Sequence, residues 1–135
     1  MKKEDILKKL RSSGLRPTKQ RVEIARFLFE RDKTFHFTVE SLDKLLAKRT
    51  TSKFALATIY NTVHAFKKAG HLSEVEVRGK KTYFDTNITN HHHFYDSETC
   101  ELIDIDANDV VIQKIPKAPN GKKIKNVEVF INLKN

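Results

Sequence analysis

The 135-residue sequence predicts an α+β protein. Four segments in its first half space their apolar residues as one face of a helix does. Shorter runs after Leu72 alternate apolar and polar residues, as strands do. With 39% hydrophobic residues, including nine Phe, the chain can bury a modest core, as one ordinary domain or two small ones.

Capping signals mark the ends of the predicted helices. The leading helix is expected to end near Gly14, the second to be capped by Thr18 and the third by Thr38. The fourth covers roughly residues 55–69, and Gly70 is placed to close it. The residues expected to face inward are Ile6, Leu7, Leu10, Val22, Ala25, Leu28, Phe29, Val39, Leu42, Leu45, Leu46, Leu56, Ile59, Tyr60, Val63 and Phe66.

The segment LSEVEVRGKKTYFDT is expected to form a hairpin with a basic tip. Three helices behind a short leading one, followed by such a hairpin, describe a winged helix-turn-helix domain, whose last helix can enter a DNA major groove. The exposed residues expected to reach DNA are Thr58, Asn61, Thr62, His64 and Lys68 on the fourth helix and Arg78, Lys80 and Lys81 on the hairpin. A basic helical domain whose charges are merely solvated is the alternative that this pattern leaves open.

Charge is distributed unevenly along the chain. The net charge is +9, and residues 1–90 hold 20 Lys and Arg against 10 Asp and Glu, so a polyanionic partner is expected for this part. No apolar run approaches the roughly 18 residues that cross a membrane, and the N-terminus lacks the apolar core of a signal peptide. Because Cys100 is the only cysteine, no intramolecular disulfide is possible, and a cytoplasmic location is expected.

The chain changes character after Asp85. We expect a winged-helix domain at 1–85, a polar hinge at 86–90, and a small α/β domain at 91–135. In the last, ELIDI is expected to be a short strand, NDVVIQKI one or two helical turns, and IKNVEVFINLKN a strand with Val127, Val129, Ile131 and Leu133 on one face. Two short strands bury too little alone, so a homodimer is expected, which suits a near-palindromic site.

His91, His92 and His93 stand together before six acidic residues that no Lys or Arg interrupts until Lys114. Imidazole binds transition metals and haem iron, whereas three adjacent histidines can also be a plain solvated loop. One alternative has His92 facing solvent, with His91 and His93 forming a simple metal site.

Five blocks, GLRPTKQRVEIARFL, HFTVESL, ATIYNTVHAFKKAGHL, KTYFDT and NHHHFYDSETCELIDI, follow one another in an order and spacing that resemble the ferric uptake regulator family. The resemblance covers nearly the whole chain, and the region around the fourth helix and the histidines looks most like the haem- and iron-responsive iron response regulator branch. It implies a dimeric cytoplasmic transcription factor, with a winged helix, a hinge and a dimerisation domain, that binds double-stranded DNA at an AT-rich, near-palindromic operator.

The resemblance also implies the site residues. An inter-domain divalent metal (zinc, iron(II) or manganese) would be held by His36, Asp85, His91, His93 and Asp104. Arg16 and Arg21 resemble residues that reach the DNA backbone or minor groove, and Tyr60 resembles one used at thymine, although its spacing alone suggests a core position.

Departures from the family pattern remove some expectations. The first C-x-x-C pair of many relatives is replaced by Asp96-Ser-Glu-Thr99, so a four-cysteine zinc site is excluded. A second family metal site is not expected, because Val111 and Val127 stand at its ligand positions. Asn61 replaces the usual arginine, which predicts a different base preference. Ala55 replaces a capping serine, so the fourth helix is expected to lose the stabilisation of this cap unless Ser52 caps it one turn earlier.

Haem remains an alternative ligand. The Cys-Pro haem motif of some iron response regulators is missing, because Glu101 follows Cys100, so His91, His92 or His93 would have to ligate the iron. A zinc- or peroxide-sensing regulator of the same family is also open. A metalloenzyme is disfavoured, because no H-E-x-x-H or Gly-rich phosphate loop is present.

Overall fold

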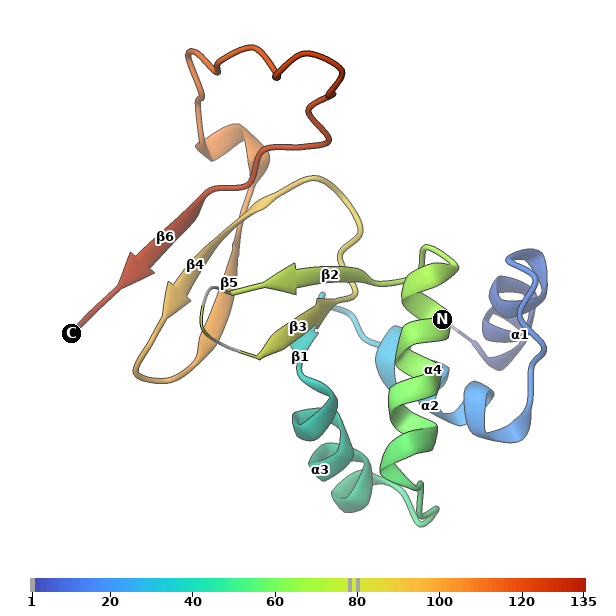
Figure 1. Cartoon of the computed structure of the whole chain (residues 1–135). Coiled ribbons are helices and arrows are strands. Elements are labelled where there is room, and N and C mark those ends of the chain that lie inside the picture. Colours follow the sequence, from blue (N-terminus) through green and yellow to red (C-terminus); the bar gives the residue numbers. More distant parts are fainter. Residues whose placement is uncertain (1, 78, 80) are drawn as a thin grey trace. The chain divides into compact units, whose positions relative to one another are not determined.

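The computed structural model describes residues 2–135 except Arg78 and Lys80. It divides into two compact units, Met1–Ile88 and Thr89–Asn135, and Figure 1 shows their helices and strands. The first unit contains α1 (Lys3–Ser12), α2 (Lys19–Phe29), β1 (His36–Phe37), α3 (Val39–Arg49), α4 (Leu56–Lys68), β2 (Ser73–Glu76) and β3 (Thr82–Asp85). The second contains β4 (His92–Asp96), β5 (Glu101–Ile105), the 3-10 turn η1 (Ala107–Asp109) and β6 (Phe130–Leu133).

The helix ends follow the predicted capping signals. The Thr18 hydroxyl accepts a hydrogen bond from the Arg21 amide, and the Thr38 hydroxyl accepts one from the Ser41 amide. At the end of α4, the Gly70 amide donates to Lys67 O and the His71 amide to Phe66 O, a Schellman motif that requires the positive φ of Gly70. These predicted boundaries are confirmed to within a residue or two.

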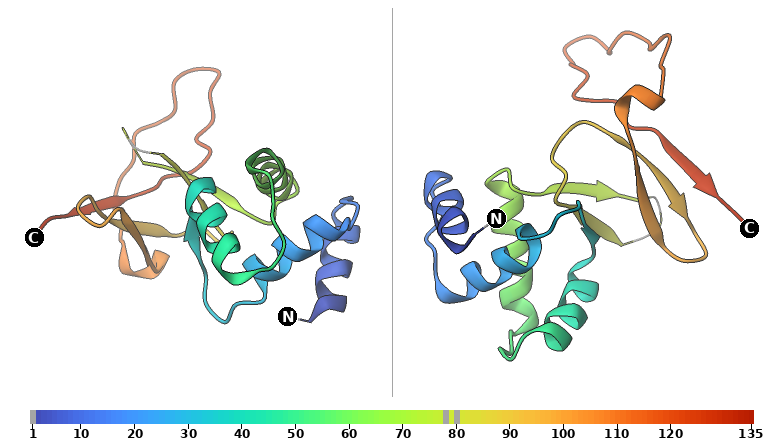
Figure 2. Two further views of the ribbon diagram at one scale, coloured as in Figure 1. Left: turned by 90° about the horizontal axis from the view of Figure 1, so that it is seen from below. Right: turned by 180° about the vertical axis from the view of Figure 1, so that it is seen from behind.

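The four helices bury a common core. It includes Ile6 and Leu10 of α1, Ile24 and Leu28 of α2, and Phe66 of α4, each at most 1% exposed. Figure 2 shows α4 crossing beside α2 and α3, while α1 lies against α2. Apolar burial of this kind contributes about 25 cal/mol per Å² and stabilises the helical part.

The inward face predicted for α4 needs correction. Leu56 and Tyr60 are 53% and 52% exposed, whereas Thr62, predicted to be exposed, is only 5% exposed. The buried stripe of α4 is narrower than a full amphipathic face, because only Ile59, Val63 and Phe66 reach the core together with Thr62. One side of the helix is therefore free to meet a partner.

A small antiparallel sheet follows the helices, with strand order β1-β3-β2. In its register His36 lies opposite Asp85 and Phe37 opposite Phe84. Because successive side chains of a strand point to opposite faces, Phe37 and Phe84 join the helical core and His36 and Asp85 lie on the other face. The predicted hairpin is confirmed by the pairing of β2 with β3, although Arg78 and Lys80 at its tip lie outside the described residues.

The second unit is a three-stranded mixed sheet with the order β5-β4-β6. Its central strand β4 was not predicted, because the histidines and Phe94-Tyr95 lack the alternation by which strands are recognised. The strand at Glu101–Ile105 is confirmed. The helical turns predicted over NDVVIQKI are wrong beyond Asp109, since η1 covers only Ala107–Asp109 and residues 110–115 are irregular. The last strand begins only at Phe130, so the predicted four-residue stripe fails at Val127 and Val129, which precede it.

Between η1 and β6 the chain is long and irregular. Residues 110–129 contain no helix or strand, and nearly all of residues 111–126 are exposed; the segment is the orange and red loop above β6 in Figure 1. Pro116 and Pro119 oppose a helix there. None of the described helices is both long and apolar enough to cross a membrane.

Candidate metal centre and nucleic-acid surface

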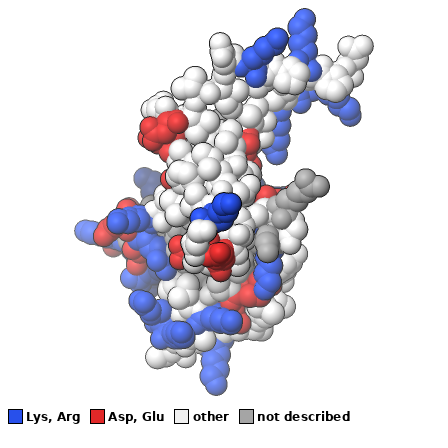
Figure 3. Space-filling view, turned by 90° about the vertical axis from the view of Figure 1, so that its left-hand side faces the viewer, with Lys and Arg blue, Asp and Glu red and all other residues white. Residues whose placement is uncertain are grey.

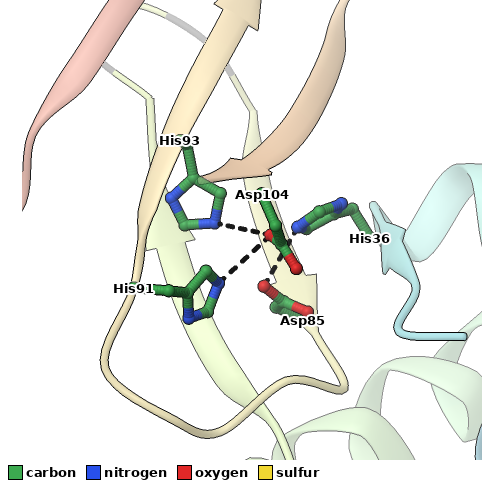
Figure 4. Close-up of side chains that lie close together, drawn as sticks. All are labelled: His36, Asp85, His91, His93 and Asp104. Atoms are coloured by element: carbon green, nitrogen blue, oxygen red, sulfur yellow. Dashed lines mark ion pairs between the residues drawn. The ribbon is translucent and has the colours of Figure 1, made fainter. Parts of the chain in front are cut away.

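The first unit places one histidine against one carboxylate. His36 Nε2 lies 3.0 Å from Asp85 Oδ2, and Asp85 is fully buried. The Asn87 amide donates to the other carboxylate oxygen, Oδ1, at 2.8 Å. The neighbouring strands β1 and β3 thus fix both side chains, which Figure 4 shows facing each other. We call this pair the β1–β3 set.

The second unit places two histidines against another carboxylate. Asp104 Oδ1 lies 3.2 Å from His91 Nε2 and 3.4 Å from His93 Nε2, as the dashed lines in Figure 4 mark. The register of β4 with β5, which sets His93 opposite Asp104, produces this arrangement. We call these three residues the β4–β5 set.

Hydrogen bonding fixes which nitrogen of His91 is available to a metal. His91 Nδ1 lies 2.6 Å from the carbonyl oxygen of Thr89, and since a carbonyl only accepts, Nδ1 carries the proton. In the neutral ring the lone pair is then on Nε2, the nitrogen that lies 3.2 Å from Asp104 Oδ1. Metal-ligating histidines are commonly oriented by such a bond from the second ring nitrogen.

The spacing within each set fits ligands that share one ion. Two ligands each about 2.1 Å from a metal, at angles between octahedral and tetrahedral, are about 3.0 to 3.4 Å apart. All three nitrogen-to-oxygen distances, 3.0, 3.2 and 3.4 Å, lie in that range. Imidazole nitrogen with carboxylate oxygen is a donor combination that suits zinc, iron(II) and manganese. Each set can therefore supply part of a divalent-metal site.

His92 does not face solvent, contrary to one of the predicted alternatives. It is 7% exposed, and its Nδ1 accepts a hydrogen bond from the Val129 amide at 3.0 Å. The neutral ring must then carry its proton on Nε2, so neither nitrogen offers a lone pair while this bond is intact. The register of β4 also turns His92 to the opposite face of the sheet from His93.

The residues predicted to contact DNA fall around two hollows of the first unit. One hollow, of about 370 Å³, lies between α2 and α4 and brings together Arg16, Arg21, Thr58 and Asn61. It is also lined by Gln20, which the sequence prediction missed. An exposed polar residue between two arginines at a helix start was the signal that could have found it.

The predicted alternative cap of α4 is not present. Ser52 does not cap α4, since its hydroxyl donates to Glu23 Oε2 at 3.0 Å.

The second hollow, of about 390 Å³, lies between α4 and the β2–β3 wing. Tyr60, His64 and Lys81 line it, together with Leu56 and Phe84. Tyr60, which the periodicity places in the core, is instead half exposed at its rim. Arg78 and Lys80 belong to the same predicted surface but lie outside the described residues.

The charge of the first unit suits a phosphate backbone. On the face in Figure 3, Lys and Arg side chains gather at the lower left and bottom and again at the upper right, with groups of Asp and Glu between them. Several of the cations are partly neutralised, as Arg26 is by Glu30 at 2.8 Å and Lys67 by Glu74 at 3.0 Å. The predicted DNA-contacting residues Arg16 and Asn61 are exposed.

Three packed helices and a β-hairpin beside the last of them define a winged helix-turn-helix protein. The chain belongs to the ferric uptake regulator family, because the family model "Ferric uptake regulator family" matches residues 12–133. A curated relative, the peroxide-responsive repressor PerR of Staphylococcus epidermidis, is 30% identical over 101 residues, which are 75% of this chain and 65% of that protein. The chain thus spans slightly less than two thirds of the length of that relative.

Solved structures agree with the fold. The Vibrio cholerae ferric uptake regulator superposes with a TM-score of 0.71, covering 96% of this chain and 98% of that one at 20% identity. The Pseudomonas aeruginosa ferric uptake regulator with manganese gives a TM-score of 0.68, covering 100% and 98% at 22% identity. At these identities the likeness establishes the α+β architecture and the winged helix.

Proposed function

We propose that the protein is a homodimeric transcriptional regulator whose operator affinity is set by a divalent metal. His36 and Asp85 of the β1–β3 set and His91, His93 and Asp104 of the β4–β5 set hold the ion together. Bound there, the metal supplies a fixed cross-link between two units that are otherwise joined by a short polar segment. The family membership and the donor chemistry of the two sets support this proposal.

The observation that carries the proposal is the orientation of His91. Its Nδ1 proton is committed to the Thr89 carbonyl, so Nε2, the nitrogen near the Asp104 carboxylate, is the one that the neutral ring can offer to a metal. A solvated histidine loop has no reason to fix the ring in this way. A cation between imidazole and carboxylate lowers the cost of holding these polar groups away from water.

DNA binding is assigned to the exposed side of α4. Asn61 can pair with adenine in the major groove, Tyr60 can meet a thymine methyl group, and Arg16 and Arg21 can contact phosphates. The excess of positive charge in this unit supplies the sequence-independent part of the affinity. Asn61 in place of the family's usual arginine favours a base preference different from that of most relatives.

A second copy of the chain is assigned to the open face of the small sheet. Ile103 on β5 and Ile131 on β6 are 45% and 41% exposed and lie on either side of Phe94 in register. This apolar row on one face has no cover within the described part of the second unit, and two copies would bury it together. Dimerisation would also match two half-sites of an operator.

The test uses the full chain and a duplex selected by its binding from a random library. Fluorescence anisotropy measures operator affinity with Zn²⁺, Mn²⁺ or anaerobic Fe²⁺ and after chelation. We expect at least one metal to change affinity by about tenfold or more, and His93→Ala to abolish the change. His71→Gln serves as the matched control, because His71 lies outside both sets. A response of unchanged size in His93→Ala would refute the assignment of the site.

A peroxide-sensing regulator is the second candidate, favoured by the 30% identity to a relative named a peroxide-responsive repressor. Its signature is irreversible: peroxide acting on the Fe²⁺-loaded protein would add one oxygen atom to a histidine of the site. Peptide mass spectrometry after peroxide treatment measures this, with the Zn²⁺-loaded protein as the control. Unmodified histidines together with retained DNA binding would leave the reversible metal sensor as the function.

Control by haem or iron status is the finer form of the proposal. Haem ligation by His92 would require the bond to Val129 to break, and ligation by His91 or His93 would remove a partner from Asp104. A haem titration followed in the Soret band distinguishes haem from a divalent metal ion as the regulating ligand. A stoichiometric band that is lost when His91, His92 and His93 are all alanine would make haem the signal, whereas no stoichiometric band would leave the metal.

A further inference from the structure

Four aromatic rings form a continuous stack through the first unit, from the exposed side of α4 to the small sheet. The rings of Tyr60 and His64 are 4.2 Å apart between centroids. His64 meets Phe84 edge-on at 5.5 Å, and Phe84 stacks on Phe37 at 5.8 Å. The stack begins at a half-exposed Tyr60 and ends at Phe84 and Phe37, which are each only 2% exposed.

The inner end of this stack adjoins the β1–β3 set. Phe37 follows His36 directly on β1, and Phe84 precedes Asp85 on β3, so two facing residue pairs are adjacent in the register. One pair points into the helical core and the other to the opposite face. A shift of either strand that adjusts His36 or Asp85 around an ion must therefore also move a ring of the stack.

The outer end of the stack depends on His64. Tyr60 lines the hollow between α4 and the wing and is 52% exposed, so among the described residues its side chain is only partly enclosed. Its ring is held instead by contact with His64 one helical turn later. His64 in turn touches buried Phe84 and thus joins a surface side chain to the close-packed core, where small displacements are passed on rather than absorbed.

We propose that His64 is a positioning residue for Tyr60, and that metal bound at His36 and Asp85 alters operator affinity through Phe37, Phe84 and His64. The proposal rests on the proposed function, since it assumes that a metal occupies the β1–β3 set and that Tyr60 reads the operator. It adds a route of regulation contained within the first unit. This route acts on the orientation of a reading side chain.

The first experiment measures coupling, defined as the ratio of operator affinities with saturating Zn²⁺ and after chelation. His64→Ala removes the ring and should reduce this ratio by about threefold or more. His64→Phe keeps an aromatic ring at the same place and should restore the ratio to within about twofold of the unaltered chain. Lys68→Ala, on the same helix but outside the stack, should weaken binding with and without Zn²⁺ alike and leave the ratio unchanged.

The second experiment needs no DNA. Ring signals of Tyr60, assigned with Tyr60→Phe, are followed by nuclear magnetic resonance while Zn²⁺ is added to the full chain. We expect these signals to shift in the unaltered chain and in His64→Phe, and to stay in place in His64→Ala. Zinc bound to each variant is measured in parallel, so that a lost shift is not confused with lost metal.

The outcomes separate this inference from the function on which it rests. A metal response of the same size in His64→Ala would overturn the route and leave the metal-dependent regulator intact. Tyr60 signals that ignore bound Zn²⁺ would do the same. If the chain selects no duplex, the proposed function fails, and the Tyr60 shift alone decides whether the stack transmits metal binding. If none of Zn²⁺, Mn²⁺ and anaerobic Fe²⁺ binds, both are refuted.

Discussion

The three adjacent histidines, His91, His92 and His93, have different partners. His91 and His93 present Nε2 to one carboxylate, while the ring between them accepts a backbone hydrogen bond on the opposite face of the sheet. Three neighbouring residues of one type thus have two different roles. The alternation of a strand is sufficient to explain the division.

His92→Ala tests this division. The change leaves the partly buried Val129 amide without its acceptor and should lower the free energy of unfolding by about 1 kcal/mol, measured by urea denaturation. Zinc affinity should be nearly unchanged in the folded variant, whereas His93→Ala should lower it by more than about 100-fold. Loss of zinc binding in a folded His92→Ala variant would show that His92 is a ligand.

His71 gives the first unit a defined dependence on pH. Burial lowers the pKa of its imidazole, and the positive charge of Lys9 lowers it further. Its Nε2 also lies 2.7 Å from Ser13 Oγ, which links the end of α4 to the end of α1. Below the ordinary histidine pKa of about 6.5 the unfolded chain then binds more protons than the folded one.

We therefore expect the free energy of unfolding to fall as the pH drops from about 6.5 towards the lowered pKa of the folded state. The contribution of His71 to stability should be fully present above about pH 6.5. Urea denaturation of the unaltered chain and of His71→Gln, at about pH 7.5 and about pH 5.5, measures this contribution. The unaltered chain should lose more stability between the two conditions than His71→Gln does. Equal losses would mean that His71 titrates alike in both states.

At the level of the helices and strands, α4 begins without a side-chain cap. Ala55 has the extended backbone of an N-cap residue, with φ −64° and ψ 144°, but no side-chain oxygen to accept from the first turn. Thr18 and Thr38 supply that bond for α2 and α3. The helix assigned to DNA reading is thus the one of these three with the least secured start.

Ala55→Ser should supply the missing bond and raise the free energy of unfolding by about 0.5 to 1 kcal/mol. Chemical denaturation measures the gain. Ala47→Ser, the same change at an exposed position inside α3, is the matched control and should be slightly destabilising because serine is a poorer helix former than alanine. Equal effects at both positions would show that α4 gains nothing from a cap.

The helices were predictable because each carries its own signal: Thr18 and Thr38 start two of them, and Gly14 and Gly70 end two others. Strand β4 was not, because its histidines occupy both faces and its burial depends on pairing with β5 on one side and with the distant β6 on the other. The ligand residues were found by family resemblance. The bond from Val129 to His92 could not be predicted, since it joins residues far apart in the sequence, and the bond from His91 to Thr89 depends on the exact backbone conformation of a local turn.

For the whole molecule, the question is whether one ion engages both units. A free Zn²⁺ concentration of about 100 times the dissociation constant should stabilise the unit or units that bind the ion by about 2.7 kcal/mol. Hydrogen exchange read by mass spectrometry locates that gain. Zn²⁺ should slow exchange in peptides around Phe37 and Phe84 as well as in those around Tyr95.

His36→Ala should confine the zinc-dependent protection to the second unit, and His93→Ala should weaken it in both. Arg31→Ala, near β1 but outside both sets, is the control and should leave the pattern unchanged. Protection limited to the second unit in the unaltered chain would show that the ion takes its ligands from the β4–β5 set alone.

The irregular segment before β6 makes the chain susceptible to proteolysis. Lys114, Lys117 and Lys122 lie exposed on chain that lacks helix or strand, which is the kind of backbone that proteases cut first. The strand that follows carries Phe130, whose ring stacks on His93 at 5.7 Å. A single cleavage there would cut β6, the strand that packs beside a proposed ligand, from the chain, so limited trypsin digestion would remove this support while all five proposed ligands stay on one polypeptide.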